Sequence, residues 1–373
     1  MTTEELYKEL REQKEYMTHG ERMAAYMRGE EVDYQPYALL APDDALASVW
    51  GYTKEQVRTS FELKCEMIRR KKEEYGFEGM YVGLGLRGIG EAVGSKIVYP
   101  QNSTDYVAEH YMMDYDRLGE MEEFEVKNNQ FLSDKLTEAK MLMERFPDMG
   151  ISTDAAGPIS TAVALRPIEY VLRDMRKNPE KLHRLLSLGV DCSLKWVKTF
   201  YEETGSTAVG FADPVTTTDV LGLKYFKEFS KPYIKKLFDG IYEITGNKPS
   251  IHICGRTRKI WDDLLEIGVD NFSLDNCESM EEAKSCLGHQ MFLSGNVSPV
   301  DIMRYGSVND VIEAVRNVLL QASDSPSGFM ISTGCQIPIG TPKQNMDAYV
   351  YAVRKYGYGA RKGERCKGLL DMK

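Results

Sequence analysis

Short apolar runs alternate with longer amphipathic runs along most of the chain. The short runs are rich in β-branched, aromatic and glycine residues, which is the pattern of buried strands. We predict eight strands from these runs: "YALLA" near 37, "GMYVGL" near 79, "GIST" near 150, "AVGFA" near 208, "SIHIC" near 250, "NFSL" near 271, "MFLSG" near 291 and "GFMIST" near 328.

The segments between these strands carry helical patterns. The first 30 or so residues are expected to be helical, ending near "MRGEE". Ile168 to Gly205 predicts a long helical pair that breaks near Pro179. Ser279, with two glutamates just behind it, is typical of a helix start, and the run from Pro342 to Gly357 opens with proline and stops at glycine.

Eight strands with helices between them indicate an α/β protein with a (β/α)8 TIM barrel. Periodicity alone also permits an open doubly wound sheet. No linker or break in composition separates two domains. We therefore expect a helical extension over residues 1–30 and one barrel domain over residues 31–373, with the long early loops forming a cover.

Composition and charge narrow the class of protein. The chain has 373 residues, of which 42% are hydrophobic and 28% charged, as in a soluble globular protein. The net charge of -10 argues against a nucleic-acid partner, because phosphate binding needs a basic face. No run approaches the roughly 20 apolar residues that span a bilayer, and the polar start does not resemble a signal peptide. A cytoplasmic protein without a membrane partner is expected, and a homodimer is an open alternative.

Several residues that can carry chemistry follow the predicted strands. In a barrel, such residues surround one pocket. His252 and Cys254 end the fifth strand, Asp275 follows the sixth and Cys335 follows the eighth. The His-x-Cys pair by itself leaves three readings open: a metal site, a cysteine nucleophile with a histidine base, or two packed side chains. Adding Cys335 brings the metal reading level with the packed pair, since two thiolates and an imidazole suit catalytic zinc with one labile position.

Other residues are candidates for catalysis or substrate binding. Asp213 in "FADP" is a candidate zinc ligand, proton donor or substrate anchor, although an Asx turn before the proline explains it equally well. The stretch "GLGLRGIG" does not fit the dinucleotide fingerprint, and we predict a tight loop that lines the pocket, with Arg87 and Glu91 as substrate contacts. Asn296, after the seventh strand, is a third predicted substrate contact.

Several motifs occur together in order and resemble the uroporphyrinogen decarboxylase superfamily. The likeness runs from about residue 20 to 360, and it implies a single (β/α)8 barrel. The matching pieces are "GPISTA", "FADPVTTTDVLG", "IHICG", "GVDNFSLD", "LSGNVSP" and "STGCQIPIGTPKQN".

The decarboxylase branch of this superfamily fits poorly. Its arginine-rich N-terminal motif is missing here, and Gly85 stands about where its early aspartate would fall. Its Gly-His-Gly turn at the last strand is replaced by Gly334-Cys335-Gln336. A substrate with several carboxylates needs a cationic pocket, which the sequence does not offer. Decarboxylation is therefore the alternative reading, together with a non-catalytic barrel that acts as a binding protein.

The corrinoid-dependent zinc methyltransferase branch fits better. The chain resembles methylcobalamin:coenzyme M methyltransferases and O-demethylase methyltransferases. Their His-x-Cys…Cys motif falls on His252, Cys254 and Cys335, and an acidic residue after the sixth strand falls on Asp275, where the family often has glutamate. Asp275 is thus the implied fourth ligand, with Asp213 or water as the alternative.

The resemblance also implies the cofactors and partners of the reaction. Zn²⁺ would be bound by the chain, and the corrinoid would arrive on a separate protein or as free cobamide. The small substrate is a methylated donor or a thiol acceptor such as coenzyme M. The early loops, with "APDDALASVWGYT" and "GIGEAVGS", exceed what a minimal thiol methyltransferase needs and favour a bulkier donor such as a methoxyarene.

Overall fold

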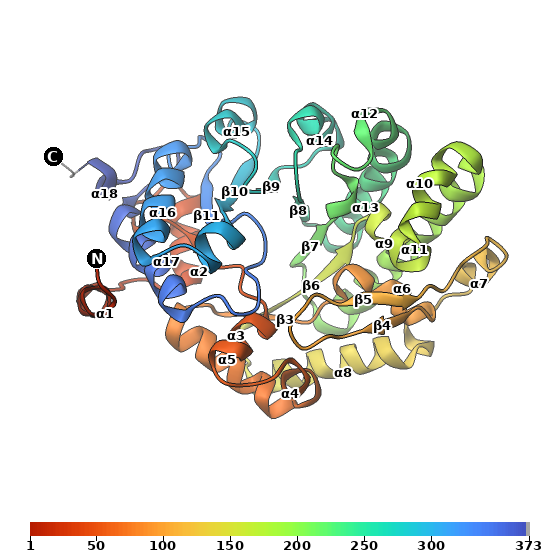
Figure 1. Ribbon diagram of the computed structural model, residues 1–373, viewed down its shortest axis with the longest axis horizontal. Helices are drawn as coiled ribbons and strands as arrows, with labels where there is room; N and C mark the ends of the chain where they lie inside the picture. Colours follow the sequence, from red (N-terminus) through yellow and green to blue (C-terminus); the bar gives the residue numbers. More distant parts are fainter. Residues whose placement is uncertain (371–373) are drawn as a thin grey trace. The chain divides into compact units, whose positions relative to one another are not determined.

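The eight predicted strands are all present in one parallel sheet of the computed structural model, which describes residues 1–370 (Figure 1). The strand order is β2-β11-β10-β9-β8-β7-β6-β3. The strands are β2 (Tyr37–Ala38), β3 (Gly79–Tyr81), β6 (Gly150–Ala156), β7 (Val209–Ala212), β8 (Ser250–Ile253), β9 (Asn271–Leu274), β10 (Phe292–Val297) and β11 (Phe329–Thr333).

The strand order decides between the two predicted architectures. In an open doubly wound sheet the strand order reverses at a switch point, so the first strand lies inside the sheet. Here the strands from β3 to β11 follow one another in sequence order, and the first strand of the sheet, β2, pairs in parallel with the last, β11, through Ile331 opposite Tyr37. This is the order of a (β/α)8 barrel, and the predicted fold class is confirmed.

The chain divides into two compact units, residues 1–78 with 270–373 and residues 79–269. The first unit contains β2, β9, β10 and β11. Its helices are α1 (Thr3–Glu12), α2 (His19–Met27), α3 (Asp43–Val49), α4 (Lys54–Thr59), α5 (Phe61–Tyr75), α15 (Met280–Leu287), the π-helix η6 (Pro299–Arg304), α16 (Val308–Ala322), α17 (Lys343–Tyr356) and α18 (Lys367–Leu370).

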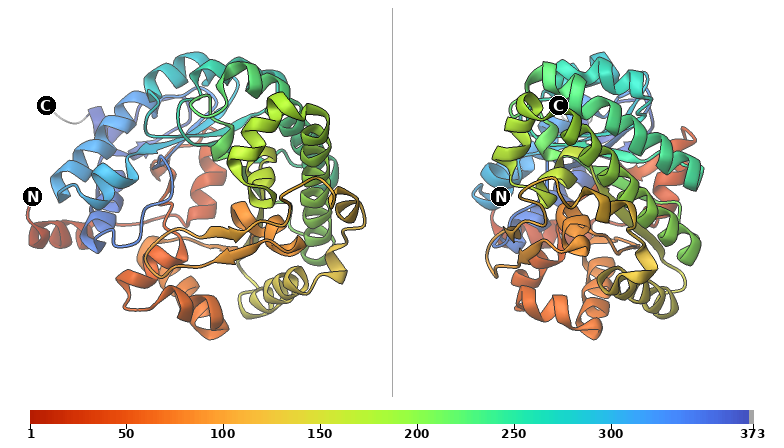
Figure 2. Two further views of the ribbon diagram at one scale, coloured as in Figure 1. Left: turned by 45° about the vertical axis from the view of Figure 1, so that its right-hand side comes forward. Right: turned by 90° about the vertical axis from the view of Figure 1, so that its right-hand side faces the viewer.

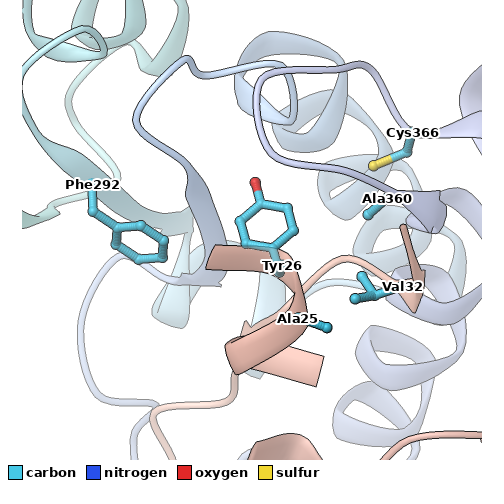
Figure 3. Packing of buried hydrophobic residues seen from close by; sticks show 6 residues of the cluster. All are labelled: Ala25, Tyr26, Val32, Phe292, Ala360 and Cys366. Atoms are coloured by element: carbon cyan, nitrogen blue, oxygen red, sulfur yellow. The ribbon is translucent and has the colours of Figure 1, made fainter. Parts of the chain in front are cut away.

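A small ladder joins the two sequence segments of the first unit. β1 (Val32–Tyr34) pairs antiparallel with β12 (Tyr358–Ala360). An apolar cluster covers this ladder, and Figure 3 shows Tyr26 of α2 with Phe292 to one side and Cys366 to the other. The Tyr26 hydroxyl accepts a hydrogen bond from the Phe329 N–H at 3.1 Å. The N-terminal helices are therefore tied to the last strands of the sheet.

The second unit contains β3, β6, β7 and β8. The helix α11, which is 26 residues long and yellow-green in Figure 2, packs against α8, α9 and α13. The other elements are η1 (Gly85–Arg87), α6 (Gly88–Val93), β4 (Lys96–Val98), β5 (Tyr106–Glu109), α7 (Leu118–Glu122), η2 (Val126–Asn128), α8 (Gln130–Arg145), α9 (Pro158–Leu165), α10 (Ile168–Lys177), α11 (Pro179–Thr204), η3 (Pro214–Thr216), α12 (Gly222–Tyr225), the π-helix η4 (Phe226–Ser230), α13 (Lys231–Thr245), η5 (Arg258–Ile260) and α14 (Trp261–Ile267).

Most helix predictions hold, and one loop differs. The Ser279 hydroxyl accepts the Glu282 N–H at 3.2 Å and caps α15, and the break near Pro179 separates α10 from α11. The stretch "GLGLRGIG" is a short 3₁₀ turn, η1, running into the helix α6, where a loop was predicted. Within residues 1–370, no helix has the length and apolar character needed to cross a membrane.

A buried ion pair anchors the helices of the second unit. The Arg166 guanidinium, 2% exposed, donates to the Asp174 carboxylate at 2.8 and 3.0 Å. The same carboxylate accepts from Tyr115 Oη and Asn178 Nδ2, each at 2.8 Å. Burial opposes ionisation of Asp174, but these hydrogen bonds outweigh it and lower the pKa of the carboxyl group.

We expect Arg166→Met to lower the free energy of unfolding by about 3–5 kcal/mol, because the buried Asp174 charge loses its partner. The matched control is Arg173→Met, since Arg173 contacts the same carboxylate at 3.4 Å from a half-exposed position and should contribute less than about 1 kcal/mol. The Asp174 pKa is depressed in the wild type. The stability that the ionised carboxylate contributes is therefore fully present above the unfolded-state pKa and is lost as pH falls through the folded-state pKa. The deficit of Arg166→Met, followed by thermal denaturation, should therefore stay nearly constant from pH 7 to pH 5 and shrink as pH falls below about 4, towards the depressed pKa of Asp174. An equal deficit in both variants would contradict this role.

Candidate metal centre

His252 lies in β8 and Cys254 lies one residue beyond its end, and the two face the same side because side chains alternate along an extended chain. Ile251 and Ile253 take the opposite side and are 1% and 0% exposed. His252 and Cys254 are half-buried, and the distance between His252 Nε2 and Cys254 Sγ is 3.2 Å. Two soft donor atoms therefore lie side by side at the carboxyl end of a strand, as the sequence predicts.

Cys335 lies two residues beyond the end of β11 and is half-buried. Its backbone carbonyl accepts a hydrogen bond from Thr333 Oγ1 at 2.7 Å. The preceding residue, Gly334, has no room for a side chain, since a Cβ there would lie 2.4 Å from the Asn276 backbone nitrogen. The loop that carries Cys335 is thus packed tightly against the loop that follows β9.

One group of side chains in the part of the chain described here could hold a metal ion: His252, Cys254 and Cys335, whose ligand atoms lie within 4.8 Å of one another. Two thiolates and an imidazole are the donor set that suits zinc, so the residues fit the predicted ion. By contrast, burial raises the pKa of the Cys192 and Cys366 thiols to about 12, and neither is a thiolate at neutral pH.

Asp275 does not belong to that group. It follows β9, and its Oδ1 accepts a hydrogen bond from the Cys277 N–H at 3.0 Å, as in an Asx turn. Asn296, predicted as a substrate contact, is 8% exposed in β10. Its amide nitrogen donates to the carbonyl oxygens of Asp275 at 3.0 Å and Glu278 at 2.8 Å. Asn296 therefore holds the loop of Asp275, and the ligand role of Asp275 stays a prediction.

Asp213 follows β7 in the sequence, and its fully buried carboxylate lies at the N-terminal end of α9. Its carboxylate accepts hydrogen bonds from the Ile159 N–H at 3.1 Å and from the Ser160 N–H and hydroxyl at 2.8 and 2.6 Å. Burial raises the pKa of Asp213 to about 6, and these donors limit the rise. The carboxylate thus caps a helix that begins 55 residues earlier in the sequence, rather than serving a local turn. A catalytic role for Asp213 stays a prediction.

The loop of Arg87 and Glu91 is held by a carboxylate that the sequence does not single out. Asp154, at the carboxyl end of the neighbouring strand β6, accepts the N–H groups of Leu84 at 2.7 Å and Gly85 at 3.2 Å. Burial raises the Asp154 pKa, opposed by these donors and the Tyr81 hydroxyl. The sequence signal was an aspartate just where the third predicted strand ends.

Arg87 and Glu91 differ in their surroundings. The half-buried side chain of Arg87 forms no hydrogen bond or ion pair with any residue in the described range 1–370. Glu91 accepts a hydrogen bond from the Tyr99 hydroxyl. β3, β6, β7 and β8 are parallel neighbours, so the loop of Arg87 and the His252-x-Cys254 pair belong to the same edge of the second unit's sheet.

With a parallel (β/α)8 strand order and a His-Cys-Cys group at its strand ends, the chain belongs to the uroporphyrinogen decarboxylase (URO-D) family, whose model matches residues 18–356. Over 345 residues it is 23% identical to the methylcobamide:CoM methyltransferase MtaA of Methanosarcina barkeri, covering 90% of this chain and 97% of the relative. Over 177 residues it is 30% identical to uroporphyrinogen decarboxylase 2, chloroplastic, of Oryza sativa subsp. japonica, covering 48% and 43%.

A solved structure described as a methyltransferase from Methanosarcina mazei has the same fold. The TM-score is 0.75 at 24% sequence identity, and the match covers 91% of this chain and 99% of the other. The family match over residues 18–356 confirms the family predicted from the motifs, and MtaA, which matches over 97% of its length, is a methyltransferase.

We expect Asp154→Ala to release the loop at Leu84 and Gly85, because two charge-assisted hydrogen bonds are lost. Each such bond contributes about 1.5–3 kcal/mol, so amide exchange at these two residues should accelerate by about 10-fold or more. Asp154→Asn keeps an acceptor oxygen and should show a smaller effect. Hydrogen exchange measured by mass spectrometry checks this, and unchanged protection in Asp154→Ala would refute the assignment.

Proposed function

We propose that this protein is a zinc-dependent methyltransferase that moves a methyl group between the cobalt of a corrinoid and a small substrate. One observation carries the proposal: a His-Cys-Cys ligand group occurs in a chain that matches a methylcobamide:CoM methyltransferase over nearly its whole length. We further propose one barrel domain over residues 31–373, a cytoplasmic location, and a corrinoid that arrives on a separate protein or as free cobamide.

The chain's own residues would bind and orient the reactants. His252, Cys254 and Cys335 would hold the zinc, with Asp275 or water in the fourth position. Zinc at such a site supplies a Lewis acid that makes a bound thiol acidic or stabilises a departing oxygen. Half-buried Arg87 would attract an anionic group of the substrate.

The thiol direction is supported by the names of the relatives, which specify coenzyme M. In this direction the S–H proton leaves and the sulfur forms a bond to the methyl carbon. The electron pair of the broken carbon–cobalt bond stays on the corrinoid. In the opposite direction a methoxylated or other methylated donor would give its methyl group to the reduced corrinoid, and the electron pair of the broken bond would stay on the donor's heteroatom. The long early segments, which include α3 and α6, support such a bulkier donor. Glu91 and Asn296 would then border the substrate, with Asp213 or Asp275 available for proton transfer.

Metal analysis tests the centre itself. Protein purified anaerobically should contain about one zinc per chain by atomic emission, and Cys335→Ala should lose most of it, since two ligands hold the ion far less tightly than three. Cys286→Ala is the matched control, because Cys286 is an exposed thiol of α15 outside the ligand group. Zinc-free wild type that binds none on addition would exclude the methyltransferase and leave a non-catalytic binding barrel.

The direction of transfer can be read from the corrinoid spectrum. With coenzyme M as the thiol, methylcobalamin should be demethylated, and Cys335→Ala should lower the rate by at least 100-fold because thiol activation is lost. A panel of methoxyarenes and methylamines with cobalt(I) corrinoid tests the reverse reaction, in which methyl–cobalt accumulates. Activity with a methoxyarene and none with the thiol would reverse the assignment. Release of carbon dioxide from uroporphyrinogen would support the decarboxylase alternative.

A further inference from the structure

We propose that the loop after β7, residues 213–219, is a backbone clamp that keeps His252 and Cys254 at a fixed mutual spacing. Thr217, Thr218 and Asp219 act as positioning residues in this clamp. The inference deepens the proposed metal site and rests on it for the identity of the ion. All the residues involved lie in the second unit.

The first contact of the clamp is made at the backbone of His252. The ladder between β7 and β8 places Ala212 opposite His252. Beyond this ladder, the Asp213 N–H donates to the His252 carbonyl oxygen at 3.0 Å. The Asp213 carboxylate in turn is held by α9, so this contact is made by a rigid part of the loop.

The clamp closes on the C-terminal side of the pair, at Arg256. The Arg256 carbonyl oxygen accepts hydrogen bonds from Thr218 Oγ1 at 2.8 Å and Thr217 Oγ1 at 3.3 Å. The Arg256 N–H donates to Asp219 Oδ2 at 3.2 Å. Both backbone groups of one residue are therefore bound by three consecutive side chains. The exposed ion pair between the Arg256 guanidinium and Asp219, at 3.7 Å, adds little.

Gly255 explains how the chain turns between Cys254 and Arg256. Its φ of +74° is a conformation that residues with a Cβ rarely adopt. A Cβ here would also lie 2.8 Å from Thr217 Oγ1. The glycine thus allows the loop after β7 to approach the backbone next to Cys254. Only three residues separate the held carbonyl of His252 from the held residue Arg256, so the Cys254 backbone has little freedom.

Clamping of this kind matters for a metal site because ligands already in place lose less conformational entropy on binding. Groups that hold ligands without contacting the metal typically change metal affinity by 10- to 100-fold when they are removed. The Thr217 hydroxyl also accepts the Asp219 N–H at 3.4 Å, so the three positioning residues support one another. We expect their removal to weaken zinc binding while the fold is retained.

The test compares zinc dissociation constants by competition with a chromophoric chelator under anaerobic conditions. Asp219→Ala and Thr218→Val should each weaken binding by about 10- to 100-fold. Asp219→Asn and Thr218→Ser keep the acceptor and the hydroxyl and should restore most of the affinity. Asp239→Ala is the matched control, because Asp239 and Asp219 are both 46% exposed and paired with a cation, and it should leave the affinity unchanged.

A second measurement needs no metal. In metal-free protein, the rate of alkylation of Cys254 by iodoacetamide, followed by peptide mass spectrometry, should rise several-fold in Asp219→Ala and stay unchanged in Asp239→Ala. If Asp219→Ala and Thr218→Val bind zinc as tightly as the wild type, the clamp is refuted. If the wild type binds no zinc, the proposed metal site is refuted instead. In that case an unchanged Cys254 alkylation rate in Asp219→Ala would refute the clamp as well.

Discussion

The alternation of side chains along β8 is the constraint on which the candidate site depends. Because Ile251 and Ile253 are buried on one side, His252 and Cys254 must share the other, and their donor atoms are 3.2 Å apart. A shift of one residue would bury the imidazole and thiol and expose two isoleucines. The same apolar contacts that stabilise the sheet therefore also set the direction of the two ligands.

The carboxylates near the strand ends serve mainly to hold backbone. Asp154 binds two N–H groups of the loop after β3, Asp213 binds the first turn of α9, and Asp219 binds Arg256. A carboxylate that accepts several backbone N–H groups fixes the loop that it contacts, and for Asp154 and Asp213 these donors limit the rise in pKa that burial causes. Loops between barrel strands are otherwise the most mobile parts of such a fold. These aspartates thus provide rigidity, which leaves the softer sulfur and nitrogen donors for a metal ion.

The fold and the ligand pair could be predicted because both depend on local patterns. Eight short apolar runs specify eight strands, and a spacing of two along a strand puts both donors on one face. What the sequence could not predict depends on contacts between distant residues. Asp154 binds a loop about 70 positions away, and the amide nitrogen of Asn296 holds the loop of Asp275 across 21 positions. The hairpin of β4 and β5 was also missed, since neither strand has a buried residue and so neither forms an apolar run. The pairing of β1 with β12 was missed because it joins segments more than 300 positions apart.

The differences from the decarboxylase branch follow from where the charges lie. The position that resembles the decarboxylase aspartate is Gly85, and its N–H is bound by the carboxylate of Asp154 on the neighbouring strand. The carboxylate near this position therefore belongs to β6 rather than to the loop after β3, and it holds that loop in place. The last strand turn carries the thiol of Cys335 in place of an imidazole. At these two positions the chain therefore has a carboxylate bound to backbone N–H groups and a thiol, and of the two only the thiol is a soft donor of the kind that zinc prefers.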